Sequence, residues 1–236
     1  MNLLRRVAAL LPEAWQYEMK RFFYKYQIRR SIFTSEEPEY SILSTIIASG
    51  DWVIDVGANV GHYTKRLSEL VGPHGRVLAI EPVPDTFALL AANVQLFTFR
   101  NVTLINAAAS DRSGVVGMAI PTASTGLKNF YQARIAAEEL CFRNLKVMTI
   151  RIDSLAIPGR VTLAKIDVEG HESAVLRGME RLLRRDLPTL IIETNSRQVV
   201  EWLTGFGYGC ERIKQSPNMI FRPIAPKRTK IENLSG

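Results

Sequence analysis

The chain has 236 residues, of which 47% are hydrophobic, 22% are charged and 8% are aromatic. This composition excludes an intrinsically disordered chain, a collagen and a disulfide scaffold, because the apolar residues suffice for a sizeable core and only 2 cysteines occur. No apolar run approaches the roughly 18–20 residues that a membrane-spanning helix needs. The length suits one large domain.

Positive charge is concentrated at the two ends of the chain, whose formal net charge is +7. Residues 1–35 contain seven Lys and Arg against two Glu, and residues 211–236 contain six against two acidic residues, whereas residues 36–210 are close to neutral. This near-neutral body argues against nucleic acid as a partner. Aromatic residues in the N-terminal arm favour a helical extension packed on its own domain, with peripheral contact with an anionic membrane surface as the alternative.

The cysteines and the first residues of the chain indicate a compartment. Cys141 and Cys210 belong to no CxxC motif, which argues against a zinc site and favours buried thiols in a reducing environment. The apolar start of the chain stops at Pro12 without a small-residue cleavage site, unlike a signal peptide. We therefore expect a cytoplasmic protein that is at most peripheral to a membrane.

From Ser35 onward, the hydrophobic pattern predicts alternating helices and strands. The predicted helices span residues 35–50, 63–71, 85–96, 173–184 and 197–204. The predicted strands span residues 52–56, 76–81, 102–106, 115–120, 147–152, 161–167, 189–193, 208–213 and 218–222. Apolar strands that alternate with helices are typical of a parallel sheet covered on both faces. We predict an α/β fold, Rossmann-like, with a mostly parallel doubly wound sheet and an antiparallel C-terminal hairpin.

Three segments are expected along the chain. Residues 1–34 are predicted to form a basic amphipathic helical extension, residues 35–223 the main domain, and residues 224–236 a flexible basic tail. Within the domain, residues 118–150 interrupt the alternation and contain aromatic and basic residues, which is typical of a loop that lines a binding pocket.

A glycine-bearing turn follows the strand at 52–56. Asp55, Gly57, Asn59 and Gly61 form the pattern Asp-x-Gly-x-Asn-x-Gly, in which glycine lets the backbone approach a ligand and the next helix start offers unpaired N–H groups. Glu81 ends the next strand, where a carboxylate can accept hydrogen bonds from both hydroxyls of a ribose. These residues predict a nucleoside-containing ligand.

The sequence of the turn also indicates which class of nucleoside-containing ligand is favoured. It lacks the Gly-x-Gly-x-x-Gly pattern that holds a pyrophosphate, which disfavours a nicotinamide-dependent oxidoreductase, and no P-loop occurs. The carboxylate of Asp55 repels a phosphate and suits a ligand with an amino group and a positive centre.

Three stretches resemble the FkbM family of class I S-adenosylmethionine-dependent methyltransferases. They are residues 50–61 around the turn, Glu81-Pro82 together with Asn93 and residues 106–111, and Lys-Ile-Asp-Val-Glu-Gly-His-Glu at residues 165–172. The resemblance extends roughly from Ser35 to Arg222. It implies a class I methyltransferase fold and S-adenosylmethionine as the cofactor.

Carried over position by position, the resemblance implies which residues bind the cofactor. They are Asp55, Gly57, Asn59, Gly61, Glu81, Asn106 and Ala107. The turn would surround the methionine moiety, with Asp55 near its amino group, Glu81 would hold the ribose, and the last two residues would border the adenine. For Asn106, capping of a strand end is the alternative.

Acidic residues follow the strand at 161–167, at the same predicted sheet edge as the glycine turn. Asp167, Glu169 and His171 are candidates for the base that removes a proton from an acceptor hydroxyl. The alternative for Glu169, and for Glu172, is to cap the next helix. Asp167, Glu193 and Asn195 would suit Mg²⁺, but nothing in their spacing requires a metal, so none is predicted.

The leading hypothesis is an S-adenosylmethionine-dependent methyltransferase that O-methylates a hydroxyl of a sugar, glycan or secondary metabolite. Oxygen is favoured by the resemblance, and no Asn-Pro-Pro-Tyr-like tetrapeptide, which would indicate N-methylation, follows Asp167. The expected partner is a small-molecule or glycan acceptor, with a pocket supplied mostly by residues 118–150. The alternative is a non-catalytic module of the same fold, attached to a membrane or nucleic acid through its basic termini.

Overall fold

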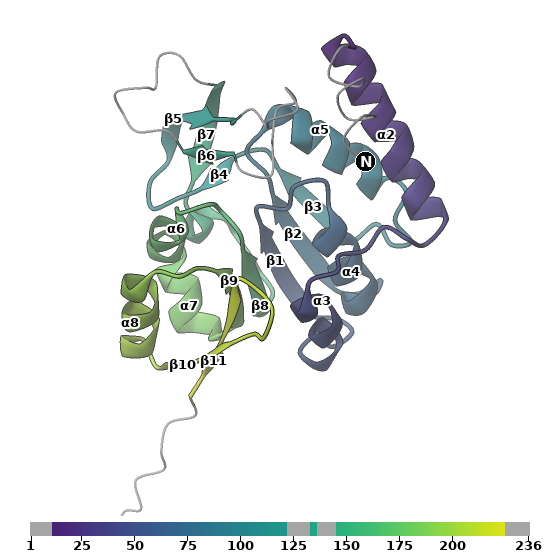
Figure 1. Ribbon diagram of the computed structural model, residues 1–236. Helices are drawn as coiled ribbons and strands as arrows, with labels where there is room; N and C mark the ends of the chain where they lie inside the picture. Colours follow the sequence, from purple (N-terminus) through teal and green to yellow (C-terminus); the bar gives the residue numbers. More distant parts are fainter. Residues whose placement is uncertain (1–10, 122–132, 136–144, 225–236) are drawn as a thin grey trace, which may run out of the picture.

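The computed structural model describes residues 11–121, 133–135 and 145–224. Its centre is a seven-stranded sheet with the order β10-β11-β9-β8-β1-β2-β3 (Figure 1). The parallel strands are β1 (Trp52–Val56), β2 (Arg76–Ile80), β3 (Val102–Ile105), β8 (Val161–Ile166) and β9 (Thr189–Glu193). The hairpin of β10 (Tyr208–Arg212) and β11 (Asn218–Pro223) joins β9 in antiparallel orientation. This arrangement confirms the predicted α/β fold.

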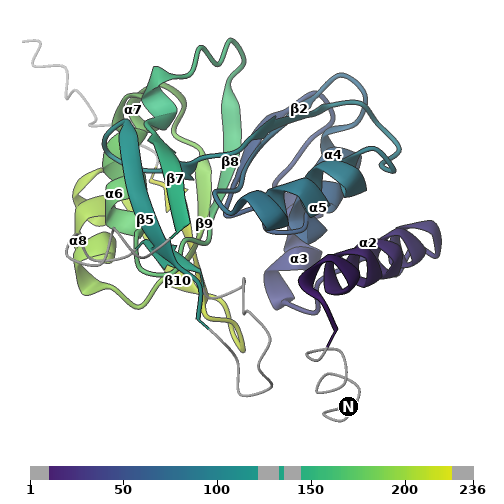
Figure 2. The ribbon, with the colours of Figure 1, turned by 90° about the horizontal axis from the view of Figure 1, so that it is seen from above.

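Helices cover both faces of this sheet (Figure 2). One face carries α3 (Pro38–Ile42), α4 (His62–Val71) and α5 (Pro84–Val94), with α2 (Glu13–Arg29) packed on α5. The other face carries α6 (Glu172–Gly178), α7 (Glu180–Asp186) and α8 (Arg197–Gly205). Because both faces are covered, the central strands are buried along nearly their whole length, as their continuous apolar sequences predict.

A second, four-stranded sheet lies beside the first, with the order β4-β7-β5-β6. Its strands are β4 (Ala108–Ala109), β5 (Gly114–Ala119), β6 (Arg134–Ile135) and β7 (Leu145–Ile150). β5 and β7 confirm two strands predicted around the irregular stretch, whose residues 122–132 and 136–144 lie outside the described residues.

Two helices differ from their predicted lengths. The helix expected at 35–50 consists only of α3 and the 3-10 helix η1 (Leu43–Thr45), since the hydroxyls of Ser41, Ser44 and Thr45 donate to backbone carbonyls three residues earlier and compete with helical bonding. The helix expected at 173–184 is divided between α6 and α7. There Gly178 lies so close to the carbonyl of Ser110 that a side chain would overlap it.

The carboxyl ends of four parallel strands are level with one another. Val56 is in register with Ile80 of β2 and with Ile166 of β8, and Ile166 is in register with Ile192 of β9. The residues that follow these strands therefore meet at one edge of the sheet. This edge positions the candidate site.

The N-terminal arm contributes α2 and the segment that connects it to α3. Ile28 and Phe33 are buried in the cluster that includes Leu90 of α5, so this part of the arm packs on its own domain, as the sequence favours. The boundary predicted at residue 35 stays a prediction, and the tail predicted at 224–236 lies outside the described residues except for Ile224.

Two further observations concern the cysteines and the length of the helices. Cys210 is an exposed free thiol on β10, so the expected burial is wrong for this residue, and Cys141 lies outside the described residues. Among the described residues, no helix is both long and apolar enough to cross a bilayer.

Replacing Phe33 tests whether the arm is part of the folded domain. Phe33 is 0% exposed, so Phe33→Ala is expected to lower the free energy of unfolding by about 3–5 kcal/mol, measured by urea denaturation. Phe22 is 73% exposed, and Phe22→Ala is the matched control, with an expected change within about 0.5 kcal/mol. Equal effects of the two substitutions would contradict this packing.

Candidate active site

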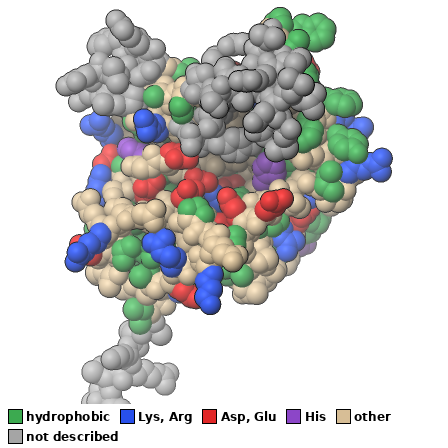
Figure 3. Space-filling view, viewed as in Figure 1, with side chains coloured by type: hydrophobic (Ala, Val, Ile, Leu, Met, Phe, Trp, Pro, Cys, Tyr) green, Lys and Arg blue, Asp and Glu red, His purple; other side chains and the backbone are tan. Residues whose placement is uncertain are grey.

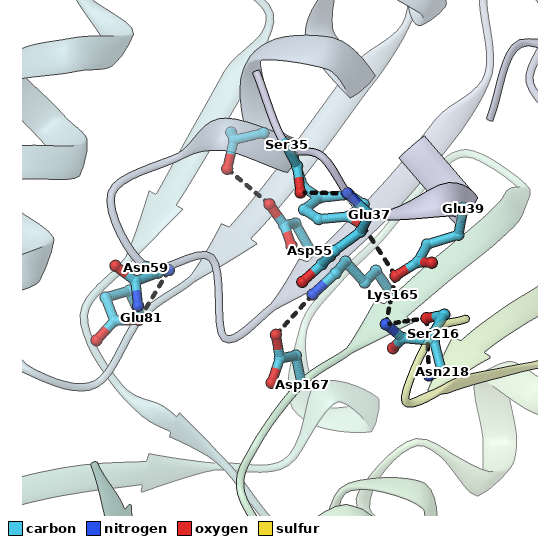
Figure 4. A network of polar contacts seen from close by, with 12 residues as sticks. Ser35, Glu37, Glu39, Asp55, Asn59, Glu81, Lys165, Asp167, Ser216 and Asn218 are labelled. Atoms are coloured by element: carbon cyan, nitrogen blue, oxygen red, sulfur yellow. Dashed lines mark hydrogen bonds and ion pairs between the residues drawn. The ribbon is translucent and has the colours of Figure 1, made fainter. Parts of the chain in front are cut away.

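A cavity of about 310 Å³ lies at the carboxyl ends of β1, β2, β8 and β9. Its volume falls in the range of ligand pockets. Figure 3 shows acidic side chains gathered around the hollow, and Figure 4 shows how those of Glu37, Asp55, Glu81 and Asp167 lie. The strand register thus brings most of the predicted site residues together.

Glu81 is fixed by the backbone of two neighbouring turns. One carboxylate oxygen accepts the N–H of Asn59 at 3.0 Å and the other accepts the N–H of Val83 at 2.9 Å. Burial raises the pKa of Glu81 to about 7, although these two N–H groups act in the opposite direction. Each oxygen keeps a lone pair beyond its backbone donor, so the carboxylate can accept two further hydrogen bonds in the cavity.

Asp55 lies at the base of the cavity and is 0% exposed. One of its oxygens accepts the hydroxyl of Thr64 at 2.6 Å, while Oδ1 has no hydrogen-bond partner. Burial raises the pKa of Asp55, and the nearby ammonium of Lys165 opposes this shift. A buried acceptor without a partner is costly, so Oδ1 is suited to a donor group of a ligand.

The glycine turn brings the ends of β1 and β8 into contact. Gly57 has a φ of +80°, and a Cβ there would overlap the carbonyl oxygen of Asp167. Asn59 has a φ of +49°, which Asn tolerates better than most residues, and lines the cavity. Gly61 has a φ of +98° and precedes α4 without lining the cavity itself.

The two residues predicted to border an adenine lie in different places. Ala107 lines the cavity. Asn106 is exposed outside it, and its side-chain amide donates to the carbonyls of Glu81 and Pro82 at 2.8 and 3.1 Å. Asn106 therefore braces the backbone beside Glu81.

A buried lysine lies among the carboxylates. Lys165 is 2% exposed, and its Nζ lies 2.9 Å from Oδ2 of Asp167 (Figure 4). The same Nζ lies 4.4 Å from the centre of the Tyr63 ring. Burial acts to lower the pKa of Lys165, but the charges of Asp167 and Asp55 outweigh it and the net shift is upward. The ammonium thus stays charged beneath the cavity.

The carboxyl groups of Asp167 and Glu193 are neighbours, and both residues line the cavity. Burial and the adjacent charge of Asp167 raise the pKa of Glu193 to about 7. A carboxyl group whose pKa lies near 7 takes up and releases a proton near neutral pH, which is the property of a general base.

The other two catalytic candidates also line the cavity. Glu169 has a φ of +50° and is largely exposed. Its partial burial and the charge of Asp167 raise its pKa. His171 has its Nε2 2.9 Å from Oγ of Ser110, and burial lowers its pKa. Glu172 closes the turn before α6, since its carboxylate accepts the N–H of Gly170 at 2.7 Å.

A family model described as the methyltransferase FkbM domain matches residues 55–210. The chain belongs to the FkbM methyltransferase family. The match confirms the resemblance seen in the sequence. The FkbM domain is an S-adenosylmethionine-dependent methyltransferase domain, so the match also confirms the cofactor that the resemblance implied.

Two curated proteins illustrate the relatives of this FkbM chain. The hexuronic acid methyltransferase AglP of Haloferax volcanii is 30% identical over 137 residues, which cover 57% of this chain and 52% of AglP. A protein-L-isoaspartate O-methyltransferase of Methanothrix thermoacetophila is 32% identical over 59 residues, which cover 25% of this chain and 28% of that protein. The chain thus spans about half the length, or less, of these relatives.

Solved structures agree in fold. The FkbM methyltransferase of Methylobacillus flagellatus superposes with a TM-score of 0.55 at 18% identity, covering 77% of this chain and 47% of that chain. A putative rRNA methylase of Clostridium thermocellum gives a TM-score of 0.52 at 14% identity, covering 79% of this chain and 94% of that one. The FkbM chain therefore has the class I methyltransferase fold.

The FkbM site contains residues that the sequence analysis missed. Lys165, Tyr63, His62 and Glu37 line the cavity, and Glu193 was considered only as a metal ligand. A signal for Lys165 exists, because a charged residue two positions before Asp167 interrupts an otherwise apolar strand and shares its face. Nothing comparable marks the other residues.

The three residues that would suit Mg²⁺ in the sequence lie at or just after the ends of β8 and β9. Asp167 and Glu193 lie together, but the side-chain oxygen of Asn195 accepts a hydrogen bond from Arg212 at 3.2 Å. Within the described ranges, no group of three or more His, Cys, Asp or Glu is arranged to hold a metal ion.

Gly57 offers a test of the contact between the two strand ends. Gly57→Ala is expected to lower the free energy of unfolding by at least about 3 kcal/mol, because the methyl group overlaps the Asp167 carbonyl and the positive φ disfavours alanine. Gly205→Ala is the matched control, since no atom lies within 4 Å of the added carbon. Thermal and urea denaturation measure both, and tolerance of Gly57→Ala would contradict the geometry.

Proposed function

We propose that this FkbM protein transfers the methyl group of S-adenosylmethionine to a hydroxyl group of a sugar acceptor. The observation that carries the proposal is the carboxylate of Glu81, held by two backbone N–H groups with its remaining lone pairs at the cavity. A pair of adjacent ribose hydroxyls is the chemical group that such a carboxylate binds with both oxygens.

The cavity contains suitable partners for the rest of the donor. The unpaired Oδ1 of Asp55 matches the amino group of the methionine moiety, and Gly57 lines the cavity near it. Ala107 offers an apolar wall for the adenine. When bound, the donor supplies a methyl group on a positively charged sulfur, which an acid-lined cavity favours electrostatically.

The acceptor hydroxyl needs a base and a fixed position. Among the candidates Asp167, Glu169 and His171, we favour Asp167 acting together with Glu193, because the raised pKa of the adjacent Glu193 lets that carboxyl group accept a proton near neutral pH. Lys165 holds Asp167 in place through its ion pair at 2.9 Å. Orientation of the hydroxyl against the methyl carbon then supplies the larger part of the catalysis.

A sugar acceptor is favoured by one relative. AglP, named for methylation of a hexuronic acid, matches more than half of this chain. Met118, Ala133 and Ile135 form part of the cavity wall, so the predicted role of residues 118–150 in acceptor binding is supported for the described residues. We assign residues 35–223 to the methyltransferase domain, and the cytoplasmic location stays a prediction.

The pKa of Glu81 predicts how donor binding depends on pH. Ribose hydroxyls bind the ionised carboxylate, so affinity for S-adenosylhomocysteine should rise with pH through about 7 and weaken about tenfold from pH 8 to pH 6. In the free protein, the stability that this raised pKa contributes is present below about pH 4.5 and lost as pH rises through about 7.

Titration calorimetry on Glu81→Gln separates this group from its neighbours. The variant should bind more weakly at pH 8 and should lose the pH dependence, whereas Glu180→Gln, which changes an exposed carboxylate, should behave as the parent does. An unchanged pH slope in Glu81→Gln would assign the titration to another group. Full affinity in that variant would refute the proposed ribose contact.

Labelled methyl transfer to free hexuronic acids and their glycosides tests the reaction itself. The parent should label an acceptor hydroxyl, with a kcat that falls as pH drops below about 7. Glu193→Gln should lower kcat by about a hundredfold or more, abolish this acid limb, and leave donor affinity within about threefold, because it removes the carboxyl group that accepts the proton beside Asp167. Glu201→Gln, at an exposed carboxylate of α8, is the control.

Donor binding without transfer to any hydroxyl would instead support a non-catalytic module. Transfer that Glu193→Gln leaves unchanged in rate and pH profile would assign the base to Glu169 or His171.

A further inference from the structure

The helix α2 has apolar side chains on two opposite faces, one of which packs on the domain while the other is exposed to solvent. Tyr17, Tyr24 and Ile28 face the domain and pack in the cluster with α5. The opposite face stays in solvent. We define the outward face of α2 as the large exposed side chains Trp15, Met19, Phe22, Phe23 and Tyr26.

The outward face is a continuous stripe. Trp15, Met19, Phe22 and Tyr26 are spaced by four, three and four residues, so they lie one above the other on the helix. Trp15 is 66% exposed and Phe22 is 73% exposed. Single exposed apolar side chains are common, but a stripe that includes Trp and Phe over nearly the whole helix marks an interaction surface.

Basic residues border this stripe. Arg21, Lys25 and Arg29 are spaced by four residues and form a row beside it, and the guanidinium of Arg30 lies 5.7 Å from the centre of the Tyr26 ring. Glu18, which pairs with Arg21 at 3.5 Å, is the one acidic side chain described on the helix. Figure 3 shows hydrophobic side chains beside Lys and Arg where Figure 1 places α2.

We propose that the outward face of α2 docks on the surface of an anionic lipid bilayer. Trp, Tyr and Phe enter the boundary between head groups and acyl chains, while the row of Arg and Lys reaches the lipid phosphates with its charged ends. The apolar stripe thus matches the acyl-chain boundary of the bilayer, and the basic border matches its phosphate layer.

Other occupants fit this face less well. Two copies paired through it would bring both rows of Arg21, Lys25 and Arg29 together, and their like charges would repel. Nucleic acid would meet the basic row but would leave the apolar stripe in water. Docking does not disturb the fold, because the packed face of α2 is separate.

Vesicle co-sedimentation of the full chain tests the proposal. The parent should bind vesicles of phosphatidylcholine with about one third phosphatidylglycerol at least about tenfold more tightly than pure phosphatidylcholine, and high salt should weaken this binding. Phe22→Glu should reduce binding about tenfold or more. Met148→Glu is the matched control, since it adds the same charge at a 65% exposed apolar side chain of β7, and it should bind as the parent does.

Fluorescence places the helix in the bilayer. Trp15 is exposed in solution, so its emission should shift to the blue on binding and be quenched by brominated lipids, and Trp15→Phe should lose most of this change. Circular dichroism and affinity for S-adenosylhomocysteine should stay unchanged in all three variants, which separates lost docking from misfolding and from failure of the proposed methyl transfer.

Three outcomes would overturn the proposal. The first is equal vesicle binding by the parent and Phe22→Glu. The second is a dimer in solution that Phe22→Glu dissociates, which would make the face an interface between copies. The third is binding to a DNA duplex or RNA hairpin in preference to anionic vesicles.

Discussion

The buried ammonium of Lys165 is the charge on which the acidic edge of the sheet depends. An isolated buried cation would cost several kcal/mol, and so would Asp55 without a countercharge. Here Lys165 pairs with Asp167 at 2.9 Å, lies over the Tyr63 ring and faces the charge of Asp55, while the Tyr63 hydroxyl contacts Glu37. The positive charge of Lys165 thus offsets the repulsion among the carboxylates of Glu37 before α3, Asp55 of β1 and Asp167 after β8.

The groups that we propose for binding the donor and for activating the acceptor are held in different ways. Glu81 is set by backbone N–H groups, which fix its position independently of other side chains. Asp167 is instead held by its ion pair with Lys165, and the pKa of Glu193 depends on burial and on the charge of Asp167. Rigid geometry suits recognition of a diol, whereas a carboxyl group with a pKa of about 7 suits transfer of a proton near neutral pH.

The sequence predicted those parts of the site that follow from strand ends. Asp55, Glu81 and Asp167 each lie at the carboxyl end of a parallel strand, and such ends meet at one edge whatever the packing. Contacts between elements distant in sequence could not be predicted in this way. The carboxylate of Glu37 accepts a hydrogen bond from the hydroxyl of Tyr63, and the side-chain amide of Asn106 donates to the backbone carbonyl of Glu81. Loop geometry and helix packing decide where these side chains point.

The contacts of the N-terminal arm could also be predicted only in part from the sequence. Aromatic residues occur on both sides of α2, so its apolar periodicity is weak and the sequence left packing and membrane contact as alternatives. The structure shows that the first alternative does not exclude the second, because Ile28 packs inward while Phe22 stays in solvent. The segment after α2 reaches the active site, since the ring of Phe33 stacks at 4.1 Å on His62, which lines the cavity. A surface helix and a cavity wall are therefore parts of one packed unit.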